Sequence, residues 1–191
     1  MQGQSKVIIF IGRPGSGKGT QAKLLAERLA WPVFSSGGKL KQIIDAGGAL
    51  SEKLRSDYVL GQLAPDWLVS YFFEETIFGL KEGVVCEGFP RTAAQARLAD
   101  EILTWFNHPY IAVHLNVSDE EALKRQLSRG QVESRPDSDT TSKVQARFDV
   151  YRTSTESVVA FFKEKGNLIE INGEQTPEEI AADIRTALAL A

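Results

Sequence analysis

The residues with the clearest chemical potential form a glycine-rich segment, residues 12–20, which reads Gly-Arg-Pro-Gly-Ser-Gly-Lys-Gly-Thr and directly follows an apolar run. Successive glycines let backbone N–H groups converge on phosphate oxygens, because no Cβ stands in the way. A helix that begins near Lys18 adds the positive end of its dipole, and the lysine adds a full charge directed at the β and γ phosphates. The segment therefore predicts a phosphate-binding loop.

The spacing departs by one residue from the general phosphate-loop pattern, in which Ser or Thr follows the lysine directly. In this sequence Gly19 follows Lys18, and Thr20 comes next. A glycine-rich turn between a strand and a helix can also be purely structural, but a lysine at this position favours phosphate binding.

The elements that position this loop follow from the hydropathy pattern. Strands that alternate with helices indicate βαβ units, and hence an α/β fold with a parallel sheet covered on both faces. Apolar, β-branched runs predict strands at residues 6–11, 84–86, 111–117 and 168–171, with a further short one at 31–34. Amphipathic segments predict helices at residues 18–29, 65–78, 92–105, 118–129, 140–165 and 176–190.

Two stretches interrupt this alternation and are expected to leave the sheet. Residues 37–63 hold short helical pieces, split by Gly47-Gly48 and by Gly61, whereas residues 130–139 are polar.

Among the remaining side chains, Cys86 is expected to be a small buried hydrophobe in a strand. In the helix at 18–29, one buried stripe is expected to hold Leu24, Leu25, Arg28 and Leu29. Packing between helices is expected for Trp31, Trp67 and Trp105.

The composition bounds the class of protein. The chain has 191 residues, 42% of them hydrophobic, which is enough for one domain with a full core. Its net charge of −3 gives no reason to expect a nucleic-acid or membrane partner. One cysteine allows no intrachain disulfide, so a reducing, cytoplasmic compartment is expected. The apolar runs are too short for a signal peptide or a membrane span.

Several segments, in the same order along residues 6–190, together resemble the nucleoside monophosphate kinases, and the adenylate kinase family in particular. The resemblance is carried by Gly-Lys-Gly-Thr at 17–20, Gly-Gln-Leu-Ala-Pro-Asp at 61–66, Glu-Gly-Phe-Pro-Arg-Thr at 87–92 with Gln95-Ala96, Arg129-Gly130 with Arg135, Arg147 and Tyr151, and Ile171-Asn172-Gly173.

The resemblance implies a P-loop NTPase fold in a single domain, residues 1–191, with a five-stranded parallel sheet flanked by helices. It also implies a helical insertion that binds the nucleoside monophosphate, at about residues 35–63, and an ATP lid at about 130–139. The lid stretch is only about ten residues long and has no cysteine, so it resembles the short-lid type without zinc.

The activity implied is reversible, Mg²⁺-dependent phosphoryl transfer from ATP to AMP, giving two ADP, by a cytoplasmic monomer. Its partners would be these small molecules, with no nucleic acid and no membrane. Two alternatives remain at this point: a kinase of UMP, CMP or another nucleoside monophosphate, and a catalytically impaired nucleotide-binding regulator. A panel of acceptor nucleotides separates them.

The resemblance also assigns roles to individual residues, mostly in positioning phosphates and neutralising their charge. It makes Lys18, Arg91, Arg129, Arg135 and Arg147 catalytic. It places ATP on Gly15, Ser16, Gly17, Lys18, Gly19, Thr20, Arg125, Arg129 and Gly173. It places AMP on Ser36, Lys41, Gly88, Arg91, Gln95, Arg135 and Arg147, with Gln95 reading the base through its amide, and it lets Glu87 hold Mg²⁺ through water.

The sequence departs from the family pattern mainly at the acceptor. Glu87 replaces an aspartate, Gly38 replaces another, and Lys41 replaces a phosphate-binding arginine. A lysine keeps the charge but loses the bidentate fork, which predicts a weaker grip on the monophosphate. In the lid stretch, Asp137 and Asp139 resemble the family's acidic pair, although Ser138 separates them.

Overall fold

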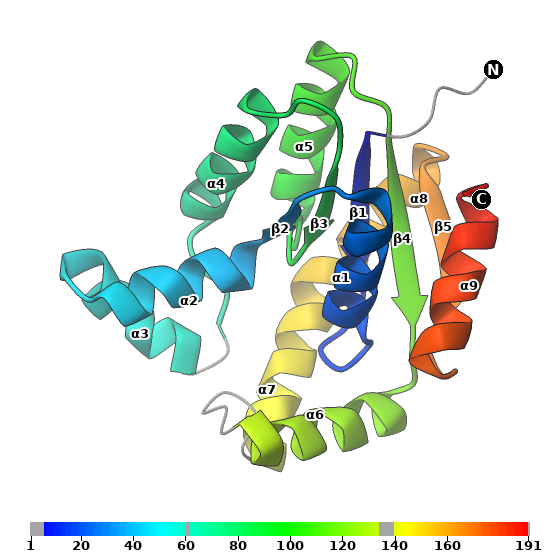
Figure 1. Cartoon of the computed structure of the whole chain (residues 1–191). Helices are drawn as coiled ribbons and strands as arrows, with labels where there is room; N and C mark the ends of the chain where they lie inside the picture. The colour runs from blue at the N-terminus through cyan, green and yellow to red at the C-terminus, as the bar shows by residue number, and fades with distance from the viewer. Residues whose placement is uncertain (1–5, 60–61, 134–139, 191) are drawn as a thin grey trace.

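Five parallel strands form one sheet in the order β2-β3-β1-β4-β5 (Figure 1). The computed structural model describes residues 6–59, 62–133 and 140–190. The expected α/β fold with a five-stranded parallel sheet is confirmed. The strands are β1 (Val7–Ile11), β2 (Val33–Ser35), β3 (Val84–Glu87), β4 (Tyr110–Asn116) and β5 (Leu168–Asn172).

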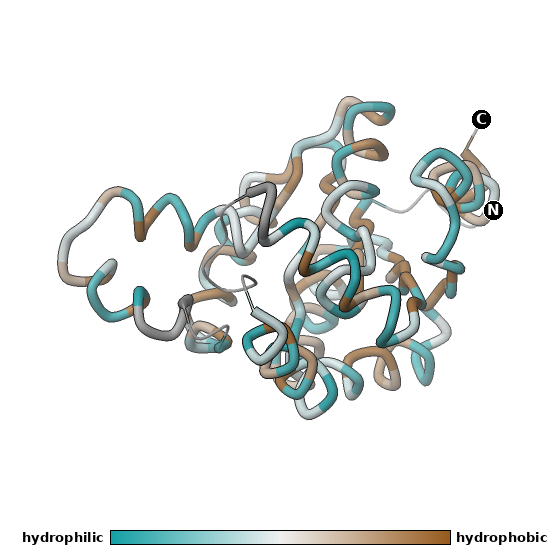
Figure 2. The backbone as a smooth tube through the Cα atoms, turned by 90° about the horizontal axis from the view of Figure 1, so that it is seen from below, coloured by the Kyte–Doolittle hydropathy of each residue, from teal (hydrophilic) through white to brown (hydrophobic). Residues whose placement is uncertain are grey.

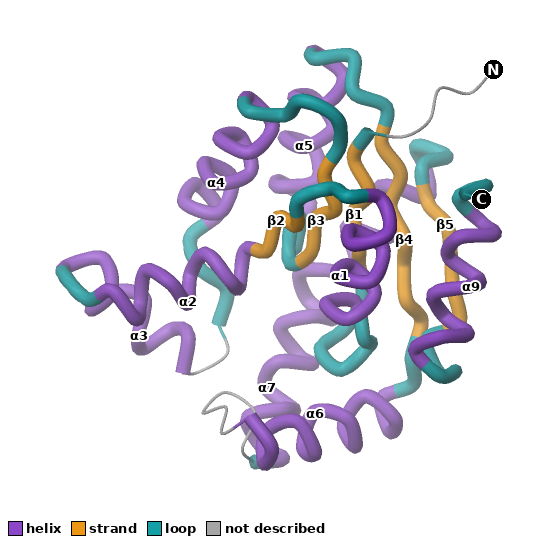
Figure 3. The backbone as a smooth tube through the Cα atoms, in the orientation of Figure 1, coloured by secondary structure: helices purple, strands orange, loops and turns teal. Residues whose placement is uncertain are grey.

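Helices follow the strands and cover the sheet (Figure 3). They are α1 (Lys18–Leu29), α2 (Ser36–Ala46), α3 (Ala49–Val59), α4 (Asp66–Phe78), α5 (Ala93–Trp105), α6 (Asp119–Glu133), α7 (Thr141–Val150), the π-helix η1 (Tyr151–Thr155), α8 (Glu156–Glu164) and α9 (Pro177–Ala187). Among the described residues, none of these helices is long and apolar enough to cross a membrane.

Side chains that alternate along the strands divide the core into two layers, because successive residues of a strand face opposite sides of the sheet. In β1, Val7, Ile9 and Ile11 pack with apolar side chains of α4, α5 and α8. Ile8 and Phe10 point the other way and pack with those of α1 and α9. The sheet is therefore buried on both faces, which explains its near-continuous apolar strands.

The orientation of α1 about its own axis differs from the prediction. The helix buries Gln21, Ala22, Leu25 and Ala26, whereas Leu24 is 40% exposed. Placing Leu24 and Arg28 in the buried stripe was therefore wrong. The helix turns its small residues to the sheet, and Gln21 Nε2 donates a hydrogen bond to the carbonyl of Pro177 at 2.8 Å.

Two of the three tryptophans are exposed instead of packed between helices. Trp67 is 68% and Trp105 76% exposed, so the prediction was wrong for both, whereas Trp31 does pack against the α1 and α9 layer. On α4 the inward face is already filled by other large side chains, such as Phe73, so Trp67 falls on the outer face. Cys86 is fully buried, as predicted.

Helices α2 and α3 form an arm that projects from the sheet (Figure 1) and is also seen from below in Figure 2. They meet at Gly47 and Gly48, which both have positive φ, at the predicted break. The segment predicted as one helix at 140–165 is instead α7, η1 and α8 in direct succession. The five-residue π-helical turn, Tyr151–Thr155, brings Tyr151 and Thr155 to the pocket described next.

Candidate active site

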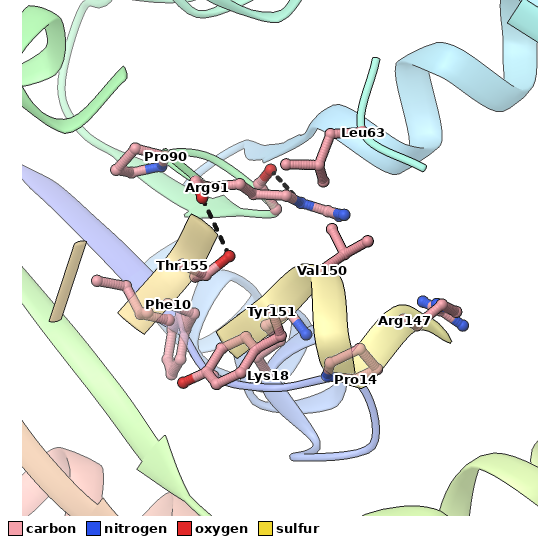
Figure 4. A pocket seen from close by; sticks show the side chains of 13 residues that line it. Phe10, Pro14, Lys18, Leu63, Pro90, Arg91, Arg147, Val150, Tyr151 and Thr155 are labelled. Carbon is pink, nitrogen blue, oxygen red and sulfur yellow. Dashed lines mark hydrogen bonds between the residues drawn. The ribbon is translucent and has the colours of Figure 1, made fainter. Parts of the chain in front are cut away.

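A pocket opens at the carboxyl ends of the central strands, where ligands bind in open α/β sheets (Figure 4). The empty space between its walls, including its opening to solvent, is about 510 Å³. Its lining comes from the end of β1, the phosphate loop, the segment before α4, the segment after β3, and the consecutive helices α7 and η1. The residues are Phe10, Ile11, Gly12, Pro14, Lys18, Leu63, Gly88, Pro90, Arg91, Arg147, Val150, Tyr151 and Thr155.

The phosphate loop is built on glycines in the left-handed region. Gly15 has φ +89° and Gly17, which precedes α1, has φ +86°. A Cβ on Gly15 would lie 2.5 Å from the carbonyl oxygen of Ala122, so the loop needs glycine there. A Cβ on Gly17 would meet nothing within 4 Å, so its role is conformational. The loop passes into α1 at Lys18, as the sequence predicted.

Lys18 carries an ammonium group with an unusual proton affinity. Its burial lowers the pKa from 10.5 to about 7, against the opposing effect of the Glu87 carboxylate. Three guanidinium groups lower that pKa further: Arg91, Arg147 and Arg129. The site therefore gathers positive charge around one partly buried lysine, and a bound polyphosphate would relieve the repulsion between these charges.

Glu87 ends β3 opposite Ser35 of β2, and the Ser35 hydroxyl donates a hydrogen bond to its Oε1. Its Oε2 makes no hydrogen bond to the described residues. These residues contain no group of three His, Cys, Asp or Glu side chains that could hold a metal by itself. Magnesium binds readily through one carboxylate, substrate phosphates and water, so the side chains present fit a nucleotide-borne Mg²⁺.

The segment after β3 holds the predicted acceptor residues in place. Gly88 has φ +78°, and its carbonyl accepts hydrogen bonds from Ser36 Oγ at 2.6 Å and from Arg91 Nε at 2.8 Å. A Cβ on Gly88 would lie 2.5 Å from Ser36 Oγ. The close approach of these three residues explains the glycine, and it leaves the end of the Arg91 guanidinium at the pocket wall (Figure 4).

The residues predicted to bind ATP or to act in catalysis also lie on α6, on α7 and directly after β5. Arg125 on α6 donates through Nη1 to the carbonyl of Gly173 at 2.7 Å, so these two are in direct contact. Ser16 is fully buried. On α7, Arg147 lines the pocket and donates to Gln126 Oε1 at 2.8 Å. Arg129, on α6, is exposed but close enough to lower the pKa of Lys18.

Other predicted residues are not at the pocket. Lys41 is exposed on α2, and its Nζ lies 2.5 Å from Asp45 Oδ2. Gln95 is buried and accepts a hydrogen bond from the backbone N–H of Arg91, whereas Thr20 is exposed on α1. Three predicted lid residues lie outside the described residues: Arg135, Asp137 and Asp139.

Two hydroxyl groups that support the site were not predicted from the sequence. Thr155 Oγ1 donates to the carbonyl of Arg91 at 3.0 Å, and Ser35 binds Glu87. No sequence signal marks Thr155, because nothing predicted the π-helical turn that carries it. Ser35 shows only the signature of a helix cap, and its hydroxyl does accept a hydrogen bond from Gly38 N at 3.1 Å.

Comparison with known proteins decides the family. The sequence model of the adenylate kinase family matches residues 10–167. The chain belongs to the adenylate kinase family. It is 38% identical to an adenylate kinase of Thermus thermophilus over 186 residues, which cover 97% of this chain and 98% of the relative. It is 37% identical to adenylate kinase 1 of Synechocystis over 94% of this chain and 95% of the relative.

A third relative, the adenylate kinase of Maricaulis maris, is 35% identical over 95% of this chain and 97% of its own. Membership of this family over nearly the full length makes the chain a nucleotide-binding phosphotransferase. The findings favour adenylate kinase activity over both alternatives, a kinase of another monophosphate and an impaired regulator.

Proposed function

We propose that this member of the adenylate kinase family transfers the terminal phosphoryl group of ATP reversibly to AMP, giving two ADP, with the residue roles that the resemblance implies. One observation carries the proposal beyond the family: Lys18 of the phosphate loop and Arg91 of the segment after β3 line the same pocket. Two phosphate-binding elements that face one pocket suit a transfer between two phosphorylated substrates.

The donor phosphates would lie on the backbone N–H groups of residues 15–20, at the amino end of α1, with Lys18 supplying a charge. Arg125 and Gly173, already in contact, would border the nucleoside of ATP. In this arrangement the loop fixes the donor through backbone groups whose direction the α1 helix sets.

The acceptor phosphate would be held by the Arg91 guanidinium, whose fork matches two phosphate oxygens, next to Ser36 and Gly88. Gln95 would read the base, and Lys41 would give the arm a charge in place of the family's arginine. Stabilisation of the charge that moves between the substrates is assigned to three side chains: Arg129, Arg135 and Arg147.

Mg²⁺ would be bound by the nucleotide phosphates and, through water, by Glu87, and it would neutralise phosphate charge. Ser35 would keep the Glu87 carboxylate directed at that position. We further propose that the arm at 35–63 and the lid at 130–139 close over the substrates and exclude water as an acceptor. The proposed working unit is a cytoplasmic monomer without nucleic-acid or membrane partners, consistent with one cysteine and a net charge of −3.

The test is ADP formation by the purified protein with MgATP and each of AMP, GMP, UMP and CMP, with a reaction lacking acceptor to report hydrolysis. Turnover with AMP far above the others supports the proposal. Turnover with UMP or CMP would show that the acceptor is a pyrimidine nucleotide and not AMP. Nucleotide binding without transfer to any acceptor would refute the proposed activity.

A matched pair of variants tests the assigned site. Arg91→Ala should lose most of the activity, because its guanidinium faces the pocket. Arg97→Ala removes the same group from an exposed position on α5 and should leave turnover and thermal stability unchanged. Equal losses in both variants would contradict the role given to Arg91.

A further inference from the structure

The side-chain amide of Gln95 is held in one orientation by two neighbours. Gln95 is 3% exposed. Its Oε1 accepts a hydrogen bond from the backbone N–H of Arg91 at 2.7 Å, and its Nε2 donates one to Asp66 Oδ1 at 2.8 Å. A backbone N–H can only donate and an ionised carboxylate can only accept. Both neighbours therefore require the same assignment of oxygen and nitrogen in this amide.

Asp66 is itself fixed in position. It is the first residue of α4, and its second carboxylate oxygen, Oδ2, accepts a hydrogen bond from Thr92 Oγ1 at 3.0 Å. The same hydroxyl accepts one from Gln95 N at 3.2 Å, where Thr92 caps α5. The carboxylate thus joins the beginnings of two helices, and it does not line the pocket. Asp66 can therefore act on the reaction only through the residues that it holds, Gln95 and Thr92, and of these Gln95 is the one assigned to the acceptor base.

The amide retains hydrogen-bonding capacity for a ligand. An amide has two N–H donors and two oxygen lone pairs, and the protein contacts above use one of each. One donor and one lone pair remain. Adenine offers the complementary pair, a donor at its 6-amino group and a neighbouring ring-nitrogen acceptor. On the edge formed by the 6-position and N1, a 6-oxo purine presents the reverse pattern, an acceptor oxygen beside an N1–H donor. That edge therefore matches only an amide that has turned over.

We propose that Asp66 is a specificity-determining residue: its carboxylate fixes the Gln95 amide in the orientation that accepts a 6-amino purine and rejects a 6-oxo purine. The inference rests on the proposed function, in which Gln95 contacts the base of the acceptor. Turning the amide over in the wild type would set its oxygen against the carboxylate and its NH₂ against the Arg91 N–H. Both hydrogen bonds would be lost together.

The variant Asp66→Asn tests this directly. An asparagine can turn its own amide and donate to the reversed Gln95 oxygen, so only the bond to Arg91 still opposes the reversal. The assay compares AMP with IMP as acceptor, because the two bases differ at the 6-position. The ratio of their kcat/KM values should fall by at least about tenfold, the factor expected when one hydrogen bond to a charged group stops opposing the wrong orientation.

Asp100→Asn provides the matched control. It makes the same chemical change on α5, at a carboxylate that accepts hydrogen bonds from Tyr110 and Lys165 and not from Gln95. Its AMP-to-IMP ratio should equal that of the wild type. A merely structural role of Asp66 would lower the thermal midpoint and reduce both kcat/KM values by the same factor, which leaves the ratio unchanged.

The outcomes separate the two proposals. A wild type that transfers to neither AMP nor IMP refutes the proposed function itself. A wild type that prefers AMP, together with a folded Asp66→Asn that keeps the full preference, overturns the role of Asp66. If Asp66→Asn does not fold, Asp66→Ser takes its place, because serine suits a helix beginning and its hydroxyl can donate or accept. An unchanged ratio in that variant overturns the inference equally.

Discussion

Nucleotide binding at the Lys18 loop should draw a proton from solution when the pH is above neutral. In the free protein, burial lowers the Lys18 pKa to about 7, so the group is largely uncharged at pH 8. Polyphosphate favours the charged form, because an opposite charge within a few ångströms stabilises the ammonium ion. Binding and protonation of Lys18 are therefore linked.

The expected stoichiometry follows from the pKa. At pH 8 a group with a pKa of about 7 is roughly 10% protonated, so full protonation on binding takes up about 0.9 proton per site. At pH 6 the free group is already about 90% protonated, and the uptake should fall to about 0.1 proton. The affinity for nucleotide should consequently decrease as the pH rises above 7.

The same shift affects stability in a defined direction. Between pH 7 and 10.5 the unfolded chain holds the Lys18 proton more tightly than the folded protein does. The contribution of Lys18 to the free energy of unfolding therefore increases as the pH rises through this window, and below pH 7 its burial penalty is fully present.

Isothermal titration calorimetry measures the uptake when MgATP is added, without acceptor, in two buffers of different ionisation enthalpy. Lys18→Arg is the matched control: it keeps a positive charge that does not deprotonate in proteins, so its binding should take up no proton at pH 8. Equal binding enthalpies in both buffers for the wild type at pH 8 would refute the reasoning, as would an uptake that persists undiminished in Lys18→Arg.

Two further predictions concern the hydrophobic core and Lys41 of the arm. Phe73 is fully buried and stacks on Phe89 with ring centroids 4.6 Å apart, so Phe73→Ala should lower the free energy of unfolding by about 3–5 kcal/mol in denaturant titrations. The exposed Trp105→Ala should change it by no more than about 0.5 kcal/mol, and a large loss there would contradict the packing described. Lys41→Arg should lower the KM for AMP with kcat unchanged, because a bidentate fork replaces a point charge. The same change at the exposed Lys53 of α3 should have no effect. An unchanged or higher KM in Lys41→Arg would show that the lysine binds the phosphate at least as well as an arginine.

The elements of this fold that the sequence predicted well are those with a local physical cause. The sequence predicted the ends of each strand to within two residues, because buried parallel strands consist of short apolar, β-branched runs. The phosphate loop was equally predictable, since a strand, a glycine turn and the amino end of a helix follow one another directly in the chain. The break at Gly47 and Gly48 belongs to the same class.

Features that depend on tertiary packing could not be predicted from the sequence. The stripe that α1 buries was misjudged, because the close fit of Ala22 and Ala26 to the sheet outweighs the hydrophobicity of Leu24. The outward position of Trp67 has a similar origin. Apolar side chains at a 3.6-residue period do not say which face is inside when both faces carry aromatic residues, as in α4.

The supporting contacts of the candidate site lie beyond sequence patterns for a different reason. Asp66 and Gln95 are 29 positions apart, and Ser35 meets Glu87 only because β2 pairs with β3. Neither contact can be recognised from the spacing of residues along the sequence. The resemblance pointed to Gln95 and Glu87 themselves, but the groups that orient them came from the structure alone.

The buried position of Cys86 has a practical consequence. It is the one cysteine of the chain, it is fully enclosed in β3, and burial raises the pKa of its thiol far above the usual range. Since the thiolate is the reactive form, this sulfur should not react with maleimide dyes in the native protein. A cysteine introduced on the exposed side of α3, paired with one on the exposed side of α6, would then take up fluorophores selectively. Energy transfer between those dyes would then report the distance between the arm and α6 during turnover.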